Sequence, residues 1–143
     1  MAATKYGHLI KNFSFKDYGP GLCRQGTEMN GKSLGYDVNI QYGAYWSAGK
    51  MGKVPGKAEV HDFDQVMIWM GTDTYDMGYL GAEVELSMGE EKEIHMVTTA
   101  TAVAVPKGTP HMPATISRMD ERFIYMTISL APTLTSKPFA KVI

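Results

Sequence analysis

The sequence lacks several features that define whole classes of protein. Only one of its 143 residues is a cysteine, Cys23, which excludes an internal disulfide and is compatible with a reducing compartment. No stretch of about 18 apolar residues occurs, so we expect no membrane-spanning helix. Residues 1–8 hold no apolar segment of the kind found in secretory signals. These absences lead us to expect a cytoplasmic protein.

The sequence also lacks an excess of charge of either sign. The chain has 14 basic and 15 acidic residues, a net charge of −1, and the two signs are mixed along the sequence. A nucleic-acid binder needs a basic face that releases counterions from phosphate, so neither a nucleic acid nor a membrane is an expected partner. Hydrophobic residues account for 44% of the chain, which is enough for the core of one domain.

The apolar residues do not follow the helical period, and a period of two dominates instead. Such alternation is typical of strands with one buried face. The clearest runs are 36–46, 82–88 and 123–130, with shorter strand-like runs at 65–70 and 102–105. In the first run, the predicted buried side comprises Tyr36, Val38, Ile40, Tyr42, Ala44 and Trp46. Residues 1–30 are harder to interpret, although Phe13 and Phe15 indicate an opening strand.

Glycine and proline separate these runs. They predict loops at 49–56 and 71–81, a hairpin turn at 89–92 and a turn-rich segment at 106–113. We expect six to eight short strands, and any helix should be short and peripheral. The predicted fold class is therefore all-β, as a sandwich or a barrel.

Two of the four histidines lie in sequences that suit a metal site. Glu59 and His61 are two residues apart, so on a strand their side chains point the same way, and Gln65 follows within reach of a short turn. His111 ends the segment 106–111, in which proline and glycine fix a sharp bend. A carboxylate and two imidazoles suit a divalent metal. The alternative is that each is an ordinary core or surface residue.

Both segments resemble the sequence motifs of the cupin superfamily. Residues 106–111, Pro-Lys-Gly-Thr-Pro-His, are similar to the second motif, Pro-x-Gly-x-x-His, and residues 59–71 to the first, His-x-His-x3-Glu before a strand ending in glycine. The resemblance is to small single-domain bacterial cupin proteins. It implies a jelly-roll β-barrel, or double-stranded β-helix, over residues 36–132, with a metal inside. Residues 1–35 would form N-terminal strands or an arm, and residues 133–143 a C-terminal tail, of the same domain.

Position by position, the resemblance implies Glu59, His61, Gln65 and His111 as metal ligands. Glu59 stands where the family has its first histidine, and Gln65 where it has its glutamate. One nitrogen is thereby exchanged for oxygen, which favours Fe(II) or Mn(II) over copper, with Zn(II) or Ni(II) as alternatives. Two histidines and one carboxylate are also the ligands of non-haem Fe(II) oxygenases. Similar cupins with glutamine at the fourth position include hydroxynitrile lyases.

Further side chains are candidates for the substrate pocket. Trp46, Met67 and Trp69 are expected to line it, although plain core packing is the alternative. Tyr42 and Tyr125 are candidates to donate a proton to a substrate oxygen, unless they only satisfy hydrogen bonds in the core.

The expected function is that of a metal-dependent enzyme acting on a small oxygen-bearing molecule. Oxygenase chemistry and redox-neutral lyase or decarboxylase chemistry both fit, with Glu59 moving protons. The alternatives are a non-catalytic domain that binds a sugar-like ligand and a purely structural interaction domain. Methionines on nearly every strand and an N-terminal segment without its own core predict a homodimer.

Overall fold

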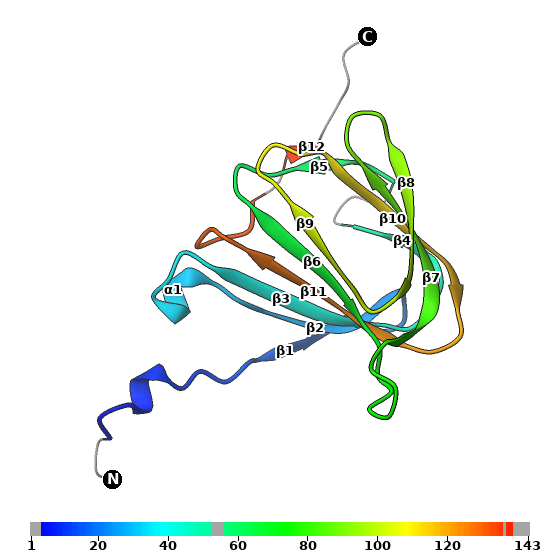
Figure 1. Cartoon of the computed structure of the whole chain (residues 1–143). Coiled ribbons are helices and arrows are strands. Elements are labelled where there is room, and N and C mark those ends of the chain that lie inside the picture. The colour runs from blue at the N-terminus through cyan, green and yellow to red at the C-terminus, as the bar shows by residue number, and fades with distance from the viewer. Residues whose placement is uncertain (1–3, 53–55, 136, 139–143) are drawn as a thin grey trace.

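Two antiparallel sheets make up the protein in a computed structural model that describes residues 4–52, 56–135 and 137–138 (Figure 1). In spatial order, the first sheet holds β1 (Phe15–Asp17), β2 (Cys23–Met29), β3 (Asn39–Tyr45), β11 (Phe123–Ser129), β6 (Gln65–Met70) and β9 (Thr101–Val105). The second holds β12 (Lys137–Pro138), β5 (Glu59–Val60), β10 (His111–Met119), β7 (Tyr79–Met88) and β8 (Glu93–Thr99), and β4 (Gly49–Met51) pairs with β10.

The sheets face each other across one hydrophobic core, and the all-β jelly-roll prediction is confirmed, although the barrel is not closed. The core residues alternate along their strands, as Met67 and Trp69 do on β6. The largest fully buried side chains of the core are Met51, Met67, Trp69, Leu80, Val84, Leu86, Ile116 and Phe123. The start of the N-terminal segment runs away from both sheets (Figure 1), and the segment reaches the first sheet at Phe13, which packs against Tyr42 of β3.

Helical structure is minor among the described residues. A 3-10 turn, η1, covers Gly7–Leu9, and α1 covers only Gly31–Leu34. Asn30 caps α1 by accepting a hydrogen bond from Ser33 N, and Gly35 ends it in the left-handed conformation. Neither helix is long or apolar enough to cross a membrane.

The first predicted strand has the expected period but the opposite orientation. On β3 the buried and cavity-facing side carries Asn39, Gln41 and Tyr45, whereas Ile40 and Tyr42 face outward. The inference from hydrophobicity was wrong here because this part of the barrel encloses a polar cavity. Apolar residues therefore occupy the outer face of the sheet.

The twelve strands in the described part of the chain exceed the six to eight predicted. Strand β8 was not predicted because all of its residues except Val97 are exposed, so its sequence shows little alternation of apolar and polar residues. Strand β2 carries charged residues and a glycine, and β10 contains Pro113, which indicated a turn. These strands are held by pairing with their neighbours more than by a recognisable pattern of their own.

Candidate metal centre and its cavity

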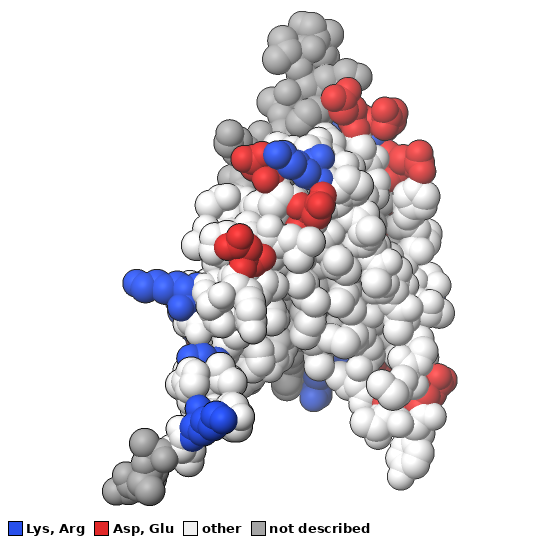
Figure 2. Space-filling view, turned by 60° about the vertical axis from the view of Figure 1, so that its left-hand side comes forward, with Lys and Arg blue, Asp and Glu red and all other residues white. Residues whose placement is uncertain are grey.

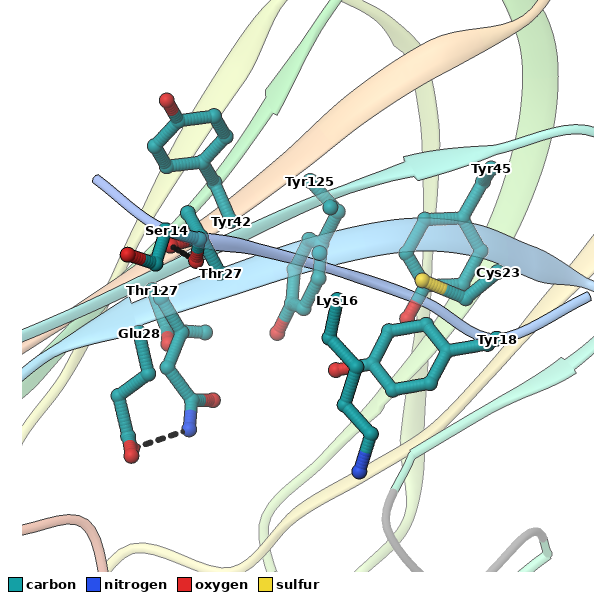
Figure 3. A pocket seen from close by; sticks show the side chains of 13 residues that line it. Ser14, Lys16, Tyr18, Cys23, Thr27, Glu28, Tyr42, Tyr45, Tyr125 and Thr127 are labelled. Atoms are coloured by element: carbon teal, nitrogen blue, oxygen red, sulfur yellow. Dashed lines mark hydrogen bonds between the residues drawn. The ribbon is translucent and has the colours of Figure 1, made fainter.

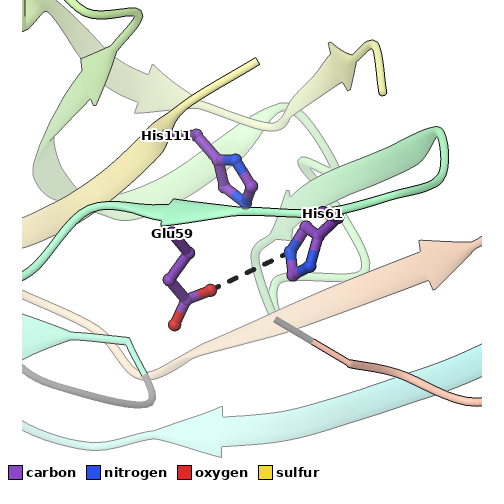
Figure 4. Close-up of side chains that lie close together, drawn as sticks. All are labelled: Glu59, His61 and His111. Atoms are coloured by element: carbon purple, nitrogen blue, oxygen red, sulfur yellow. Dashed lines mark ion pairs between the residues drawn. The ribbon is translucent and has the colours of Figure 1, made fainter. Parts of the chain in front are cut away.

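Three predicted ligands meet where β5 approaches β10. Glu59 lies on β5 directly opposite His111, the first residue of β10, and His61 follows β5 immediately. One candidate ligand atom from each residue lies within 4.8 Å of the other two, and Glu59 Oε2 is 3.9 Å from His61 Nε2 (Figure 4). Antiparallel pairing thus brings together residues that are about 50 positions apart in the sequence.

A tight turn holds His111 in place. Thr109 N donates to Pro106 O across residues 106–109, and Gly108 takes the positive φ of 80° that this turn requires. Gly108 N also donates to His61 O, which links the two predicted motifs directly. The proline and glycine of the predicted bend therefore fix the geometry of this segment.

Each histidine presents the same ring nitrogen to the group. His61 Nδ1 lies 2.8 Å from Thr135 O, and His111 Nδ1 lies 3.0 Å from Thr109 O. Because a carbonyl oxygen only accepts, each Nδ1 must donate a hydrogen, and in the neutral ring Nε2 then carries a lone pair. Backbone carbonyls orient metal-binding histidines in this way in many proteins.

Burial favours the neutral rings that a cation needs. His61 and His111 are only 6% and 2% exposed. Burial is the main cause that lowers the pKa of His111, and the nearby His61 lowers it further. With the Glu59 carboxylate beside them, these residues offer two nitrogens and an oxygen, a donor set that fits a divalent metal.

Gln65, the fourth predicted ligand, lies on the wall of the same cavity. It is buried at the start of β6, and its Nε2 donates to Ser129 Oγ at 3.0 Å. That bond uses the amide nitrogen and leaves the amide oxygen as the atom able to face a cation.

A cavity of about 810 Å³ opens from these residues. Tyr125 lines it from β11, and Tyr45 lies beside Tyr125 with ring centroids 6.0 Å apart. Burial, together with Tyr45 and Glu59, raises the pKa of Tyr125 far above the usual phenol range. Tyr125 therefore stays protonated and can act as a hydrogen-bond donor at any physiological pH.

The other predicted pocket residues lie elsewhere. Met67 and Trp69 are fully buried in the core, as in the alternative interpretation. Trp46 is 41% exposed and lies beside the guanidinium groups of Arg24 and Arg122, outside the cavity wall. It follows the outward phase of β3, for the reason already given for that strand.

Tyr42 also takes the outward phase. Its ring packs edge-on against Phe13 and Phe15, and its hydroxyl points away from the other phenols (Figure 3). Of the two tyrosines considered as proton donors, only Tyr125 faces the candidate metal centre.

Sequence reasoning missed a set of polar residues on the inner faces of β2, β3 and β11. These cavity-lining residues are Cys23, Glu28, Gln41, Tyr45 and Thr127. A signal was present, because Gln41 and Tyr45 share one phase of β3, and Tyr125 and Thr127 share one phase of β11. This signal would have identified the residues of β3 and β11, but not Cys23 and Glu28 of β2, had the polar side been assigned to the interior.

No protein-family model and no curated protein sequence matches the chain. Solved structures do match its fold. A deletion mutant of the oxalate decarboxylase of Bacillus subtilis has a TM-score of 0.55 and 11% identity, over 91% of this chain and 32% of that chain. A cupin-2 domain protein of Rhodospirillum rubrum has a TM-score of 0.54 and 12% identity, over 91% of this chain and 76% of that chain.

An oxalate oxidase in complex with glycolate has a TM-score of 0.54 and 9% identity, over 84% of this chain and 56% of that chain. The present chain thus spans only about a third of the decarboxylase and just over half of the oxidase. Identities this low show the fold alone. On these matches and on its own two-sheet topology, the chain has the fold of the cupin superfamily, the double-stranded β-helix.

Proposed function

We propose that this protein is a metal-dependent enzyme that acts on a small, oxygen-bearing organic substrate. The observation that carries the proposal is the pair of buried histidines whose Nδ1 atoms are both bonded to backbone carbonyls. Both Nε2 atoms are thereby left for a cation beside the Glu59 carboxylate. Two proteins with this fold, oxalate decarboxylase and oxalate oxidase, are by name enzymes of a small oxygen-rich molecule.

The residues of the centre have distinct proposed roles. A divalent ion held by Glu59, His61 and His111, with Fe(II) or Mn(II) preferred, would supply Lewis acidity toward a substrate oxygen. Gln65 is either a fourth ligand at a longer distance from the metal or a residue whose amide orients another ligand. Tyr125 donates a hydrogen bond to the substrate, since its phenol stays protonated. Glu59 is the carboxylate that can move a proton.

Metal content is the direct test, because a folded variant without His111 keeps only one imidazole. Elemental analysis of the purified wild-type protein should find about one divalent ion per chain. His111→Ala should lower that content at least about tenfold. His95→Ala, which removes an exposed histidine on β8, should leave it unchanged. Full metal content in a folded His111→Ala protein would contradict the assignment, and His61→Ala gives a second, independent measurement.

Oxygen uptake separates the two reaction classes within the proposal. With the metal-loaded protein, oxalate and glycolate are the first probes, because they appear with the structural neighbours. Oxygen consumption that requires metal indicates an oxygenase or oxidase. Carbon dioxide release without net oxygen consumption indicates a decarboxylase. A non-catalytic binding domain would show ligand binding with neither.

We also propose a cytoplasmic homodimer. The single cysteine suits a reducing compartment. The exposed N-terminal segment, with Tyr6, Leu9 and Ile10, is an apolar element without a partner within the described chain.

A further inference from the structure

A row of polar side chains crosses the cavity wall on three neighbouring strands. Glu28 of β2 is directly opposite Gln41 of β3, and Gln41 is directly opposite Thr127 of β11. We call Glu28, Gln41 and Thr127 the polar row. All three line the cavity that also contains Glu59 and both histidines. The cavity therefore has a second cluster of chemically active groups besides the metal centre.

Glu28 is fixed as an acceptor. Its Oε2 accepts hydrogen bonds from Asn39 Nδ2 at 3.1 Å and from Gln41 Nε2 at 2.6 Å. The two amide donors hold the orientation of the carboxylate. Both bonds end on the same oxygen, and no donor among the described residues reaches Oε1. Glu28 thus presents an oriented oxygen that can accept a further hydrogen bond.

Thr127 is the strongest sign that a ligand belongs here. Thr127 is only 7% exposed, and within the described chain its Oγ1 has no hydrogen-bond partner. A buried hydroxyl without a partner destabilises a protein unless something else completes its hydrogen bonding. Thr127 is also part of the wall of the cavity, so a bound molecule could supply that partner.

Strand β1 supplies groups of the opposite kind. Lys16 of β1 and Tyr18, the residue that directly follows β1, line a pocket of about 390 Å³. The wall of this pocket includes the polar row and shares several residues with the larger cavity. In Figure 3 the hydroxyls of Tyr18, Tyr45 and Tyr125 point into the space around the Lys16 side chain, whose ammonium extends further down in the view. No ion pair joins Lys16 to Glu28 among the residues described. Donors and acceptors therefore face the same space without neutralising each other.

We propose that the polar row binds the vicinal hydroxyl groups of a small neutral polyol, such as a sugar ring. A hydroxyl both donates and accepts, so adjacent hydroxyls can satisfy the Glu28 acceptor, the Lys16 donor and the Thr127 hydroxyl together. A dicarboxylate would place a negative charge near Glu28, and a diamine would place a positive charge near Lys16. A cavity of about 810 Å³ has room for such a ring with part of it at the metal centre.

The assignment of this polyol as the substrate rests on the proposed function, but the polar row can be tested without metal. Saturation-transfer NMR with myo-inositol, D-xylose and D-glucose, on both metal-free and metal-loaded protein, should detect binding of at least one probe. We expect dissociation constants of about 1 mM or lower and shifts of the backbone amide signals of residues 28, 41 and 127. Succinate and putrescine serve as the charged comparison probes.

Conservative variants identify the row as the site. Glu28→Gln and Thr127→Val nearly preserve shape, and each should weaken polyol binding about tenfold, the loss of one hydrogen bond to a charged or buried group. Glu85→Gln, on the exposed face of β7, should have no effect. Circular dichroism melts verify that the variants fold, and the amide shifts of the wild-type protein give a measurement that does not depend on them.

The outcomes separate the two proposals. Polyol binding by a protein that retains no metal would support the row and refute the enzyme assignment. Metal retention without binding of any polyol would refute the row and leave the enzyme assignment standing. Binding of succinate or putrescine in preference to the polyols, or variants that bind as the wild type does, would also overturn the inference.

Discussion

Two backbone carbonyls determine what His61 and His111 can do. Thr135 O and Thr109 O each take the Nδ1 hydrogen, so both rings turn the same nitrogen toward Glu59. The Pro-x-Gly-x-x-His spacing predicted the bend before His111. It could not predict the Thr135 contact, because that carbonyl lies 74 residues away and reaches His61 only in the folded chain.

The buried imidazole of His111 should make the metal-free protein sensitive to acid. Burial lowers its pKa below the usual value of about 6.5, so the unfolded chain binds this proton more tightly. Stability should therefore fall as the pH decreases below about 6.5. Urea denaturation in the presence of a chelator, at about pH 8 and about pH 5.5, would measure the change.

The contribution of His111 can be isolated with His111→Gln, which does not titrate. The loss of stability between the two pH values should be smaller in this variant than in the wild type. His95→Gln, an exposed substitution, should keep the wild-type loss. Equal losses in all three proteins would show that His111 does not favour its neutral form.

Gln65→Glu should affect affinity and stability in opposite directions. A carboxylate next to the cation adds a negative ligand, so the metal dissociation constant should fall at least about tenfold, or about 1.4 kcal/mol. Without metal, the same buried carboxylate lines one cavity with Glu59 and costs free energy, although Ser129 can donate to it. Metal titration and thermal melts with and without chelator measure the two effects.

The exposed substitution Gln25→Glu on β2 is the matched control for added charge. It should change neither the metal affinity nor the melting temperature measured in the presence of chelator appreciably. If Gln65→Glu behaves like this control, Gln65 is not at the metal.

At the scale of elements, the turn between β10 and β11 depends on a glycine in β7. Gly81 has φ of 76°, and its carbonyl accepts hydrogen bonds from both Asp120 N and Glu121 N. A Cβ at this position would lie 2.5 Å from Glu121 Cβ. The β7–β8 register shifts between Tyr79 and Val84, so this irregularity in β7 lets the turn pack closely against it.

Gly81→Ala should therefore destabilise the fold through two effects. The positive φ costs roughly 1–2 kcal/mol for a residue with a side chain, and the steric overlap adds to that. Gly19→Ala separates the effects, because Gly19 has φ of 74° but no atom lies within 4 Å of the place that an added methyl group would take. Chemical denaturation should show the larger loss for Gly81→Ala. Equal losses of stability in the two variants would mean that the turn between β10 and β11 shifts to accommodate the added methyl group at no measurable cost.

The sequence alone predicted the bounds of a strand closely where apolar residues mark that strand clearly. β6 matches its predicted bounds, and β11 ends one residue before the predicted end. It failed where pairing with neighbours stabilises a strand whose own pattern is weak, as in β8. It also reversed the inner and outer sides of β3, because hydrophobicity cannot show whether a sheet encloses a polar cavity or a dry core.

At the scale of the whole molecule, the first sheet has an almost entirely apolar outer face. Its register places Met126 between Tyr42 and Ile68, and the neighbouring rows repeat the pattern. The residues of this outer face are Ile40, Tyr42, Ala44, Val66, Ile68, Met70, Ile124, Met126 and Ile128. Most of them are partly exposed, and the space-filling view shows a broad area without charged side chains (Figure 2).

Such a face suits a second copy of the chain. An apolar surface without charges is typical of a homodimer interface, and a two-fold axis would place the same face on both partners. The exposed N-terminal segment, in which Ile10 is 73% exposed, can add its apolar side chains to the same interface. A polar ligand cavity and an apolar outer face on opposite sides of one sheet would explain why the alternation in β3 is reversed.

Ile68→Lys should convert the predicted homodimer into a monomer. The substitution places a charge near the centre of the outer face, where burial against a partner would leave it unpaired, at a cost of several kcal/mol. Light scattering at micromolar concentration should give twice the chain mass of 15.8 kDa for the wild type and the single mass for the variant. Ile94→Lys is the matched control, because Ile94 is also exposed but lies on β8 of the other sheet. A dimer lost in Ile94→Lys and kept in Ile68→Lys would move the interface to β8, and a monomeric wild type would refute the dimer itself.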